Sequence, residues 1–462
     1  MATNGTLRRT TAIALAMLTA PLAGCGRPAT VTANASDPTP PSAMWVQADV
    51  PGRPLVNVSL GGGPVAGVLA ASEQATVTAS ADDPDGGVRA LRLLIRIRRP
   101  RPGGAVLSSF QLASSTVSSA SPGQPAPASA RVTTTVSAAT LAGGGWDGGV
   151  EIMAEAENFA GQVSRSPVLS LCIERTTLRV HVVPLSDDDG GHAPQVTRTQ
   201  FADALQRANR VFCGTGIQFR FDSITGWAPR SSSGMNRDQT IKADGDALAN
   251  SMPNRVVLLL RWGSDLANIT GNGNAYPVPG IAPAPRNVTD VDQRYVALPS
   301  LYPTTGLGYL TLQNGAFLAH ELGHYLGLYH TFPGWDGLNP VFGTTPANAN
   351  QADQRVVTYV RANGGTTDAL DGDGMADTPP DPGVALFSAH GANPCTPRIT
   401  ASALVGGTRS TFTFLPDVAN AMSYYNLCDT TADPRPRDFS PAQVARMHLT
   451  LSQAPRNGLL TP

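Results

Sequence analysis

The chain has 462 residues, and its 33 basic residues nearly cancel its 34 acidic ones. This length is too great for one ordinary core and predicts two domains or more. The balance of charge gives no net field toward nucleic acid or an anionic membrane face, so we expect no nucleic-acid partner. Lys242 is the only lysine, and the arginines form no basic patch in the sequence.

Residues 1–24 have the pattern of a bacterial export signal. An arginine pair precedes an apolar run that is too short to span a bilayer, and small residues follow it. The run ends in LAGC, which resembles the lipobox of bacterial lipoproteins. The resemblance implies cleavage before Cys25 and attachment of lipid to that residue, which would hold the protein on a membrane. The alternative is plain secretion, with Cys25 incidental.

The residue after the cysteine bears on where the anchored protein would be held. Gly26 is not the acidic residue that retains some lipoproteins at an inner membrane. We therefore expect an extracytoplasmic protein at the outer membrane or the cell surface. Residues 25–43, rich in Ala, Thr, Pro and Ser, predict a flexible linker between the anchor and the folded body.

Residues 44–174 predict an all-β sandwich. Short runs of alternating apolar and polar residues, such as QATVTASADD and VRALRLLIRIRR, are separated by Gly, Pro and Asp. The stretches ADDPDGGVRALRLLI and AEAENFAGQVSRSPVLSL resemble bacterial immunoglobulin-like modules. Such a module could space a second domain from the membrane or bind a partner.

Residues 175–462 predict a second domain in which strands and helices mix. LRVHVVPL, GIQFRFDSI, RVVLLLRW and RYVALPSL are expected strands, and TRTQFADALQRANRVF is an expected helix capped by Thr199. The residues that precede the motif described next, LTLQNGAFLA, are expected to be helical as well. The chain beyond it is rich in Gly, Asn and Pro, so we expect little regular structure until SPAQVARMHLTLSQ, a closing helix capped by Ser440.

The segment HELGHYLGLYH, residues 320–330, has the spacing of a metal site. His320 and His324 are one helical turn apart and point from one face, so both imidazoles can reach one Zn²⁺. Gly327 permits the left-handed turn that ends a helix, and the chain can then return His330 as a third ligand. Three protein ligands leave one open position, as in catalytic zinc sites. Glu321 lies beside the ligands and suits a general base.

This spacing, H-E-x-x-H-x-x-G-x-x-H, resembles the zinc motif of the metzincin proteases. HELGHYLGLYHTF, DGMADTPP, NAMSYYNLC and FSPAQVARM together are similar to the pappalysin family of metzincins, over roughly residues 176–453. The resemblance implies an α+β protease domain, with a twisted mixed sheet, a zinc helix and an irregular lower subdomain. It departs from the family pattern after HTF, where a common cysteine is missing.

The same resemblance assigns further site residues. It places a Met-turn at Met422, as an apolar floor beneath the metal. It makes Tyr424 a hydrogen-bond donor to the reaction intermediate, although the adjacent Tyr425 is an alternative for this role.

Four cysteines besides Cys25 remain, an even number in an exported chain, and any of three disulfide connectivities is open. The family resemblance supports a Cys395–Cys428 pair. Cys172 would then pair with Cys213 and join the start of the protease domain to its first helix. An alternative role for Cys172 is a latency switch, in which its thiolate occupies the open metal position.

The segment DALDGDGMADTP crowds acidic residues around two glycines and predicts a structural calcium site. The candidate ligands are Asp368, Asp371, Asp373, Asp377 and Thr378. The resemblance adds weight, because relatives bind calcium near their equivalent Asp-Thr-Pro. The alternative is a solvated acidic loop.

These features together predict a zinc-dependent endopeptidase that hydrolyses proteins or peptides outside the cytoplasm and is tethered to a membrane by lipid. The alternative from another class is a surface adhesion or binding lipoprotein with an inactive protease domain. The intact histidines and Glu321 favour the enzyme, because degenerate copies usually lose one of them. His330 at its offset also disfavours a thermolysin-like site, whose third ligand is a Glu further along.

Overall fold

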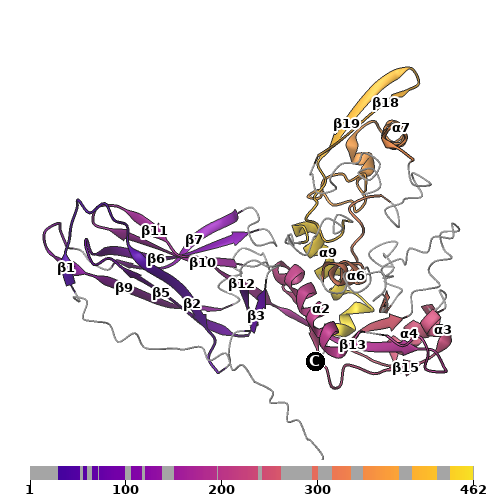
Figure 1. Cartoon of the computed structure of the whole chain (residues 1–462), viewed down its shortest axis with the longest axis horizontal. Coiled ribbons are helices and arrows are strands. Elements are labelled where there is room, and N and C mark those ends of the chain that lie inside the picture. The colour runs from indigo at the N-terminus through magenta and orange to yellow at the C-terminus, as the bar shows by residue number, and fades with distance from the viewer. Residues whose placement is uncertain are drawn as a thin grey trace, which may run out of the picture.

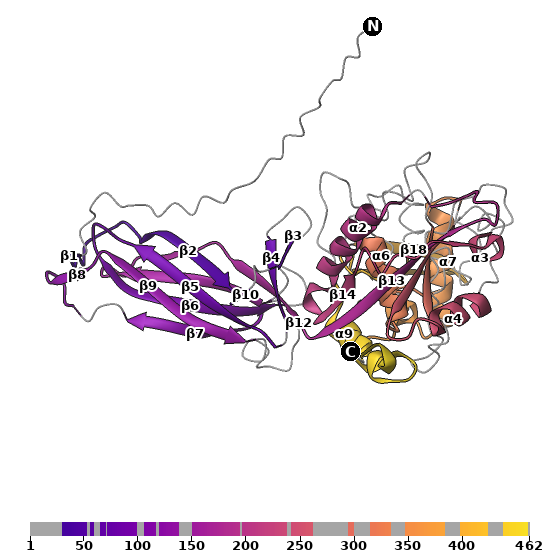
Figure 2. The same cartoon turned by 90° about the horizontal axis from the view of Figure 1, so that it is seen from below.

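The computed structural model is a mixed α+β structure with several sheets (Figure 1). A region of strands and a region of strands and helices lie side by side along the long axis (Figure 2). The structure describes residues 30–52, 56–59, 65–70, 72–98, 106–116, 120–137, 150–194, 196–237, 242–261, 294–299, 315–333, 347–383, 398–423 and 438–460.

The described residues between 30 and 174 form strands and no helix, as the alternating pattern predicts for residues 44–174. The flexible linker predicted for residues 25–43 was wrong for residues 30–43, because Thr30–Thr32 and Ser42–Asp49 are strands and Asp37 between them is buried. One sheet has the order β2 (Ser42–Asp49), β5 (Gln74–Asp82), β9 (Ser129–Ser137). A second has the order β3 (Val56–Ser59), β4 (Val65–Ala70), β12 (Leu169–Glu174), β10 (Val150–Asn158), β6 (Val88–Arg98), β7 (Val106–Thr116), with β11 (Val163–Arg165) beside β10. A short ribbon pairs β1 (Thr30–Thr32) with β8 (Pro125–Pro127).

The two larger sheets enclose one apolar core. Val77 and Ala79 of β5 pack in the same cluster as Leu93 of β6 and Ile152 of β10. Along β6, Leu91, Leu93 and Ile95 are buried and the residues between them are less so, because successive side chains point to opposite faces, whereas residues 150–154 of β10 are buried on both faces. The buried apolar area is what holds the region together.

Residues 176–299 build a parallel sheet with the order β14 (Ile217–Phe221), β13 (Thr176–Ser186), β16 (Val256–Arg261), β17 (Tyr295–Pro299), and β15 (Arg230–Ser231) also pairs with β13. Each of these strands falls where the sequence predicts one, except β15. Each pair that the described strands of this sheet form is parallel, so the antiparallel strand of the predicted mixed sheet is not among them.

Both faces of this sheet are covered, as parallel sheets require. On one face lie α2 (Arg198–Val211), α6 (Ala316–Tyr325) and α9 (Pro441–Ser452). On the other lie α3 (Ser233–Arg237) and α4 (Lys242–Asn250). Strand β16 is buried along its length, and its alternate residues enter the two different cores. One buried apolar face of the sheet therefore packs against α6.

The helices of this region begin at caps. Helix α9 begins as predicted, with Ser440 and Gln443 in a capping box. Helix α2 does not use Thr199, because Thr197 has the extended backbone of a cap and forms a capping box with Gln200. The cap was predicted two residues too late, since the Thr-x-x-Gln spacing of the earlier threonine was overlooked.

Helix α6 is shorter at its start than the sequence suggested. It begins at Ala316, because Gly315 has a φ of 68° in the left-handed region, which a helix cannot continue through. A side chain at Gly315 would clash with Arg207 and Ala208 of α2. This glycine therefore lets the two helices cross closely and sets where the helix begins.

The segment after residue 330 is more regular than predicted. It contains α7 (Ala349–Ala362), a 3₁₀ turn η3 (Thr367–Leu370) and a hairpin of β18 (Ile399–Val405) and β19 (Thr408–Phe414). Helix α7 packs on the hairpin in a separate small core, which stands apart in Figure 1. The expectation of an irregular lower part was therefore wrong for this stretch.

Two features of the sequence account for this correction. Asn348 caps α7, and apolar residues recur at helical spacing along it. Gly406 and Gly407 both have positive φ, as a tight hairpin turn requires, between two alternating runs. The abundance of Asn and Gly obscured both patterns.

A disulfide joins Cys172 of β12 to Cys213 of the 3₁₀ turn η1 (Phe212–Gly214), as expected. It links the strand region to the helix-containing region and closes a loop with a sequence separation of 41. A loop of this length stabilises the fold by about 4 kcal/mol in the chain-entropy account. Because Cys172 is bonded, it has no thiolate to offer, so the alternative role as a latency switch was wrong.

The expected signal peptide, lipobox and Cys25 lie outside the described residues. So do Cys395 and Cys428, whose pairing stays a prediction. No helix in the described ranges is long and apolar enough to cross a membrane. The chain closes with the 3₁₀ turn η5 (Arg456–Leu460).

Candidate metal centre

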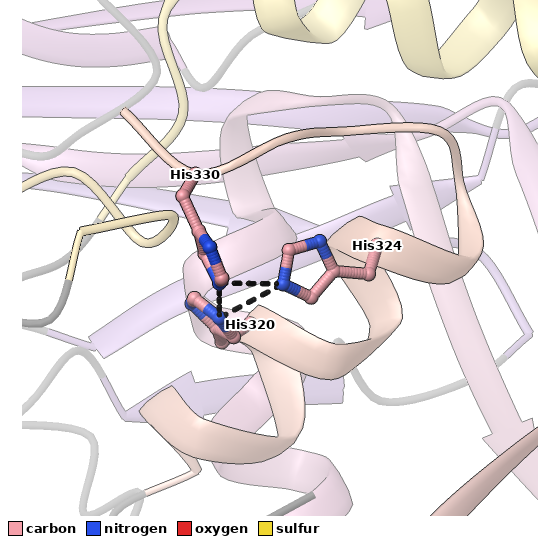
Figure 3. Close-up of side chains that lie close together, drawn as sticks. All are labelled: His320, His324 and His330. Carbon is pink, nitrogen blue, oxygen red and sulfur yellow. Dashed lines mark hydrogen bonds between the residues drawn. The ribbon is translucent and has the colours of Figure 1, made fainter. Parts of the chain in front are cut away.

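The three histidines of the motif meet at one point (Figure 3). The Nε2 atom of His324 lies 3.0 Å from Nε2 of His320 and 3.0 Å from Nε2 of His330, and the latter two are 3.2 Å apart. Three nitrogens bound to one tetrahedral zinc ion would be about 3.3 Å apart. The observed triangle is therefore close to the size that a zinc ion needs.

The other ring nitrogens fix which atoms face the centre. Nδ1 of His320 donates to the carbonyl oxygen of Ala421 at 2.7 Å, and Nδ1 of His324 donates to that of Leu328 at 2.8 Å. A carbonyl oxygen only accepts, so each Nδ1 carries the proton and each neutral ring directs the lone pair of Nε2 inward. Lone pairs that face one another repel, and a cation removes this repulsion. The donor set fits a metal.

The three ligand side chains are buried. The three histidines are between 1% and 6% exposed. Burial lowers the pKa of His324 to about 4, although the hydrogen bond to Leu328 acts in the opposite direction. The ring is therefore neutral at neutral pH, which is the form that binds metals. Burial also means that His330 is fixed by its surroundings, where it stacks on Phe332.

The motif folds as its spacing predicts. His320, Glu321 and His324 lie on α6, and Gly327 has a φ of 89°, so the chain reverses after the helix and returns His330 to its face. Glu321 is buried beside His320, with 4% of its surface exposed. This places a buried carboxylate on the same helix as two of the ligands.

Met422 is fully buried, and its sulfur lies against Gly323 of α6. A side chain at Gly323 would come within 2.5 Å of the Met422 sulfur, so the glycine allows this contact. The neighbouring Ala421 accepts the hydrogen bond from His320, and the Met422 carbonyl accepts a bond from the amide of Thr331 at 3.4 Å. One short segment thus supports both the helix and the third-ligand loop.

A second segment supports the third ligand and was not foreseen. The hydroxyl of Thr331 donates to Asp381 at 2.8 Å, and the amide of Gly372 donates to the Thr331 carbonyl at 3.1 Å. A side chain at Gly372 would clash with the backbone of Phe332. Residues that hold a metal ligand from outside the metal site orient that ligand, and their loss lowers metal affinity or activity. The sequence feature that could have indicated this support is the DTPPDP stretch, which contains Asp381.

A chain of polar side chains ties the acidic segment to the Met422 segment. The side-chain amide of Gln443 donates to Asp373 at 2.9 Å, and that of Asn420 donates to Gln443 at 3.0 Å. Asn420 in turn accepts from the amide of Met422 at 2.9 Å. All three side chains are buried, so the network is rigid as long as every partner is present.

Comparison with known proteins leaves the family open. No family model and no curated protein matches the chain. Two crystal structures of OgpA from Akkermansia muciniphila are similar at 16% and 17% identity, each with a TM-score of 0.15, over 27% of this chain and 27% and 28% of that one. A calcium-binding mutant of β-glucuronidase 2 from Bacteroides uniformis is similar at 11% identity and a TM-score of 0.13, over 49% of this chain and 34% of that one.

The chain therefore spans about a quarter to a third of the length of these solved structures. TM-scores this low carry no argument about fold or function.

The predicted calcium ligands Asp373 and Asp377 are held by different partners. Asp373 accepts from Thr378 at 2.6 Å and from the amide of Met375 at 3.0 Å, and burial raises its pKa to about 6. Asp377 instead accepts from Ser440 and the amide of Ala442 at the start of α9. Within the described ranges, the only group of three or more His, Cys, Asp or Glu side chains at metal-binding distance is the histidine triad.

A calcium ion near this segment nevertheless stays a prediction, because Asp368, Asp371, Asp377 and Thr378 line one hollow of about 400 Å³. We expect calcium to raise the melting temperature of protein that has been stripped of all metal and then reloaded with zinc alone. The Asp371→Asn substitution should reduce that rise. Calorimetry of the variant beside Asp203→Asn, an exposed change on α2, measures this. If both variants respond as the wild type does, calcium does not bind here.

Tyr424 and Tyr425 lie outside the described residues, so the structure assigns neither a position. The three predicted zinc ligands converge, Glu321 is buried on the helix that carries two of them, and Met422 is buried against Gly323 of that helix.

Proposed function

We propose that this chain is a zinc-dependent endopeptidase of the pappalysin type, with a metzincin fold and an immunoglobulin-like module before it. The observation that supports this most strongly is the buried triangle of three imidazole nitrogens with a glutamate on the same helix. A structural zinc site uses four protein ligands, whereas three leave a position for substrate or water. Within the described ranges no fourth metal-binding side chain joins the triad.

The metal ligands and Glu321 have separate roles in the proposed hydrolysis. When bound, zinc would polarise the scissile carbonyl and lower the pKa of a water molecule. Glu321 accepts the proton from the attacking water and delivers it to the nitrogen of the leaving amine. The hydrogen bonds from Nδ1 of His320 and His324 hold both rings in the tautomer and orientation that ligands need.

Metal dependence is the first test of this proposal. The purified protein should contain about one zinc per chain, as three ligands at a single centre require, and should cleave fluorescein-labelled casein. A chelator such as 1,10-phenanthroline should stop the cleavage, and added zinc should restore it. Cleavage that survives complete removal of the metal would show that another group carries out the reaction.

A tyrosine donor is part of the proposed mechanism. Tyr424→Phe should keep zinc and lower kcat by no more than about 10²- to 10³-fold, because it removes one hydrogen bond to the developing oxyanion. Tyr425→Phe is the matched control. Steady-state kinetics of both variants decide between the two, and a loss confined to Tyr425→Phe would reverse the assignment.

The competing function is an adhesion or binding lipoprotein in which the strand region does the work. It predicts that residues of the metal centre are dispensable for every measurable property except folding. The complete triad with Glu321 favours the enzyme, because an inert domain has no use for three converging imidazoles with a buried carboxylate on the same helix.

We also propose export and lipid anchoring, from the LAGC sequence. Cys25→Ser should release the protein from the membrane fraction into the soluble fraction, because the thiol that would carry lipid is gone. Fractionation of cells that express each form measures this. A variant that partitions with membranes as the wild type does would show that Cys25 is not the anchor.

A further inference from the structure

Two acidic residues far apart in the sequence meet at the end of the strand region that lies away from the helices. This end carries β1 and β8 (Figure 2). Asp37 follows β1, and Asp83 opens the turn between β5 and β6. The amide of Asn34 donates to the carbonyl of Gly86 at 3.1 Å, and the amide of Asp83 donates to that of Ala128 at 2.8 Å. The two segments are therefore packed on each other and on the adjoining chain.

Both carboxylates are buried, with only 3% of each residue exposed. One oxygen of each is satisfied: Oδ1 of Asp37 accepts from the amide of Thr39 at 2.9 Å, and Oδ1 of Asp83 accepts from the amide of Gly86 at 2.7 Å. The Oδ2 atoms are also buried, and neither accepts a hydrogen bond from the described part of the protein. Burying such an oxygen without a partner is costly, most of all on a charged group.

The two carboxylates lie against the same residue. Asp83 binds the amide of Gly86, while the Asp37 carboxylate lies so close to the Gly86 α-carbon that any side chain there would clash with it. No basic side chain among the described residues forms an ion pair with either aspartate. Two buried carboxylates thus lie at one place, and the Oδ2 atom of each has no hydrogen-bond or ion-pair partner among the described residues.

We propose that Asp37 and Asp83 bind a divalent cation through their Oδ2 atoms, and that the cation is calcium. The donors are hard oxygens, which exclude metals that prefer nitrogen or sulfur. Calcium accepts irregular sets of carboxylate, backbone carbonyl and water oxygens, whereas magnesium needs a near-ideal octahedron. With two carboxylates the site falls in the weak range of extracellular modules, with a Kd of about 10⁻⁴–10⁻³ M.

Calcium at this position would link residues 34–39, which follow β1, to the turn between β5 and β6. The site is separate from the histidine triad and from the acidic segment near Asp371. The calcium proposal can therefore be tested independently of the proposed protease function.

Hydrogen–deuterium exchange of the full-length, zinc-loaded protein tests the site locally. About 5 mM calcium, several times the expected Kd, should slow exchange several-fold in peptides that cover residues 34–39 and 83–87. The same concentration of magnesium should have much less effect. Asp37→Asn and Asp83→Asn should each abolish the protection, while Asp49→Asn, an exposed change on β2, should retain it.

Two results would overturn the proposal. Calcium that leaves exchange in both wild-type peptides unchanged shows that no such site exists, and this measurement needs no variant to fold. Protection that persists in both Asp37→Asn and Asp83→Asn shows that the ion binds elsewhere.

Discussion

A His330→Ala variant should lose both zinc and activity. It removes one of three ligands, and the remaining two imidazoles hold zinc much more weakly. The affinity should fall by more than the roughly 10- to 100-fold that the loss of an outer-shell partner costs. Metal analysis after dialysis should find well under one zinc per chain, and casein cleavage should fall in proportion.

The control for this variant is His448→Ala. His448 lies on α9 and bonds the carbonyl of Thr215 at 2.7 Å, away from the triad. It should keep zinc and activity near the wild-type level. If His330→Ala retained a full complement of zinc, the third ligand would have to be another residue.

A Glu321→Gln variant should keep zinc and lose activity. Glutamine has the size and shape of glutamate but cannot accept the proton of the attacking water. Loss of a general base lowers kcat by about 100-fold or more. Because none of the three imidazoles is altered, zinc should stay near one per chain. Metal analysis and kcat measured on the same preparation separate binding from chemistry.

Glu174→Gln is a matched control for the same chemical change. Glu174 is buried on β12 and forms an ion pair with Arg220 of β14. Its loss should lower the melting temperature and leave kcat unchanged. Equal losses of kcat in the two variants would point to a general effect on folding in place of a catalytic role for Glu321.

Much of the metal centre could be predicted because its ligands are close in sequence. Histidines four residues apart must share a helix face, and a glycine three residues later allows the reversal that returns His330. The strands of the parallel sheet were also predictable, since buried runs such as VVLLLR have few alternatives.

Apart from Met422, which the family resemblance indicated, the residues that support the centre could not be predicted, because their contacts span long sequence separations. Gln443 reaches Asp373 across 70 residues, and Thr331 reaches Asp381 across 50. No local periodicity encodes such pairs. The predicted calcium site illustrates the same limit: Asp373 and Asp377 are neighbours in sequence, yet they face different donors in the folded chain.

The segment after residue 330 shows a different kind of error. Its Gly and Asn content suggested irregular structure, yet the helix cap at Asn348 and the Gly406-Gly407 turn specify a helix and a hairpin. Composition averages over a stretch, whereas caps and turns act at single positions.

The most direct test of the central claim is mass-spectrometric mapping of new amino termini in unfolded casein. Full-length wild-type protein and Glu321→Gln, loaded with equal zinc, are incubated with the substrate side by side. The account predicts new termini with the wild type and almost none with the variant. Casein left intact by zinc-loaded wild type, or the same termini from both proteins, would contradict it.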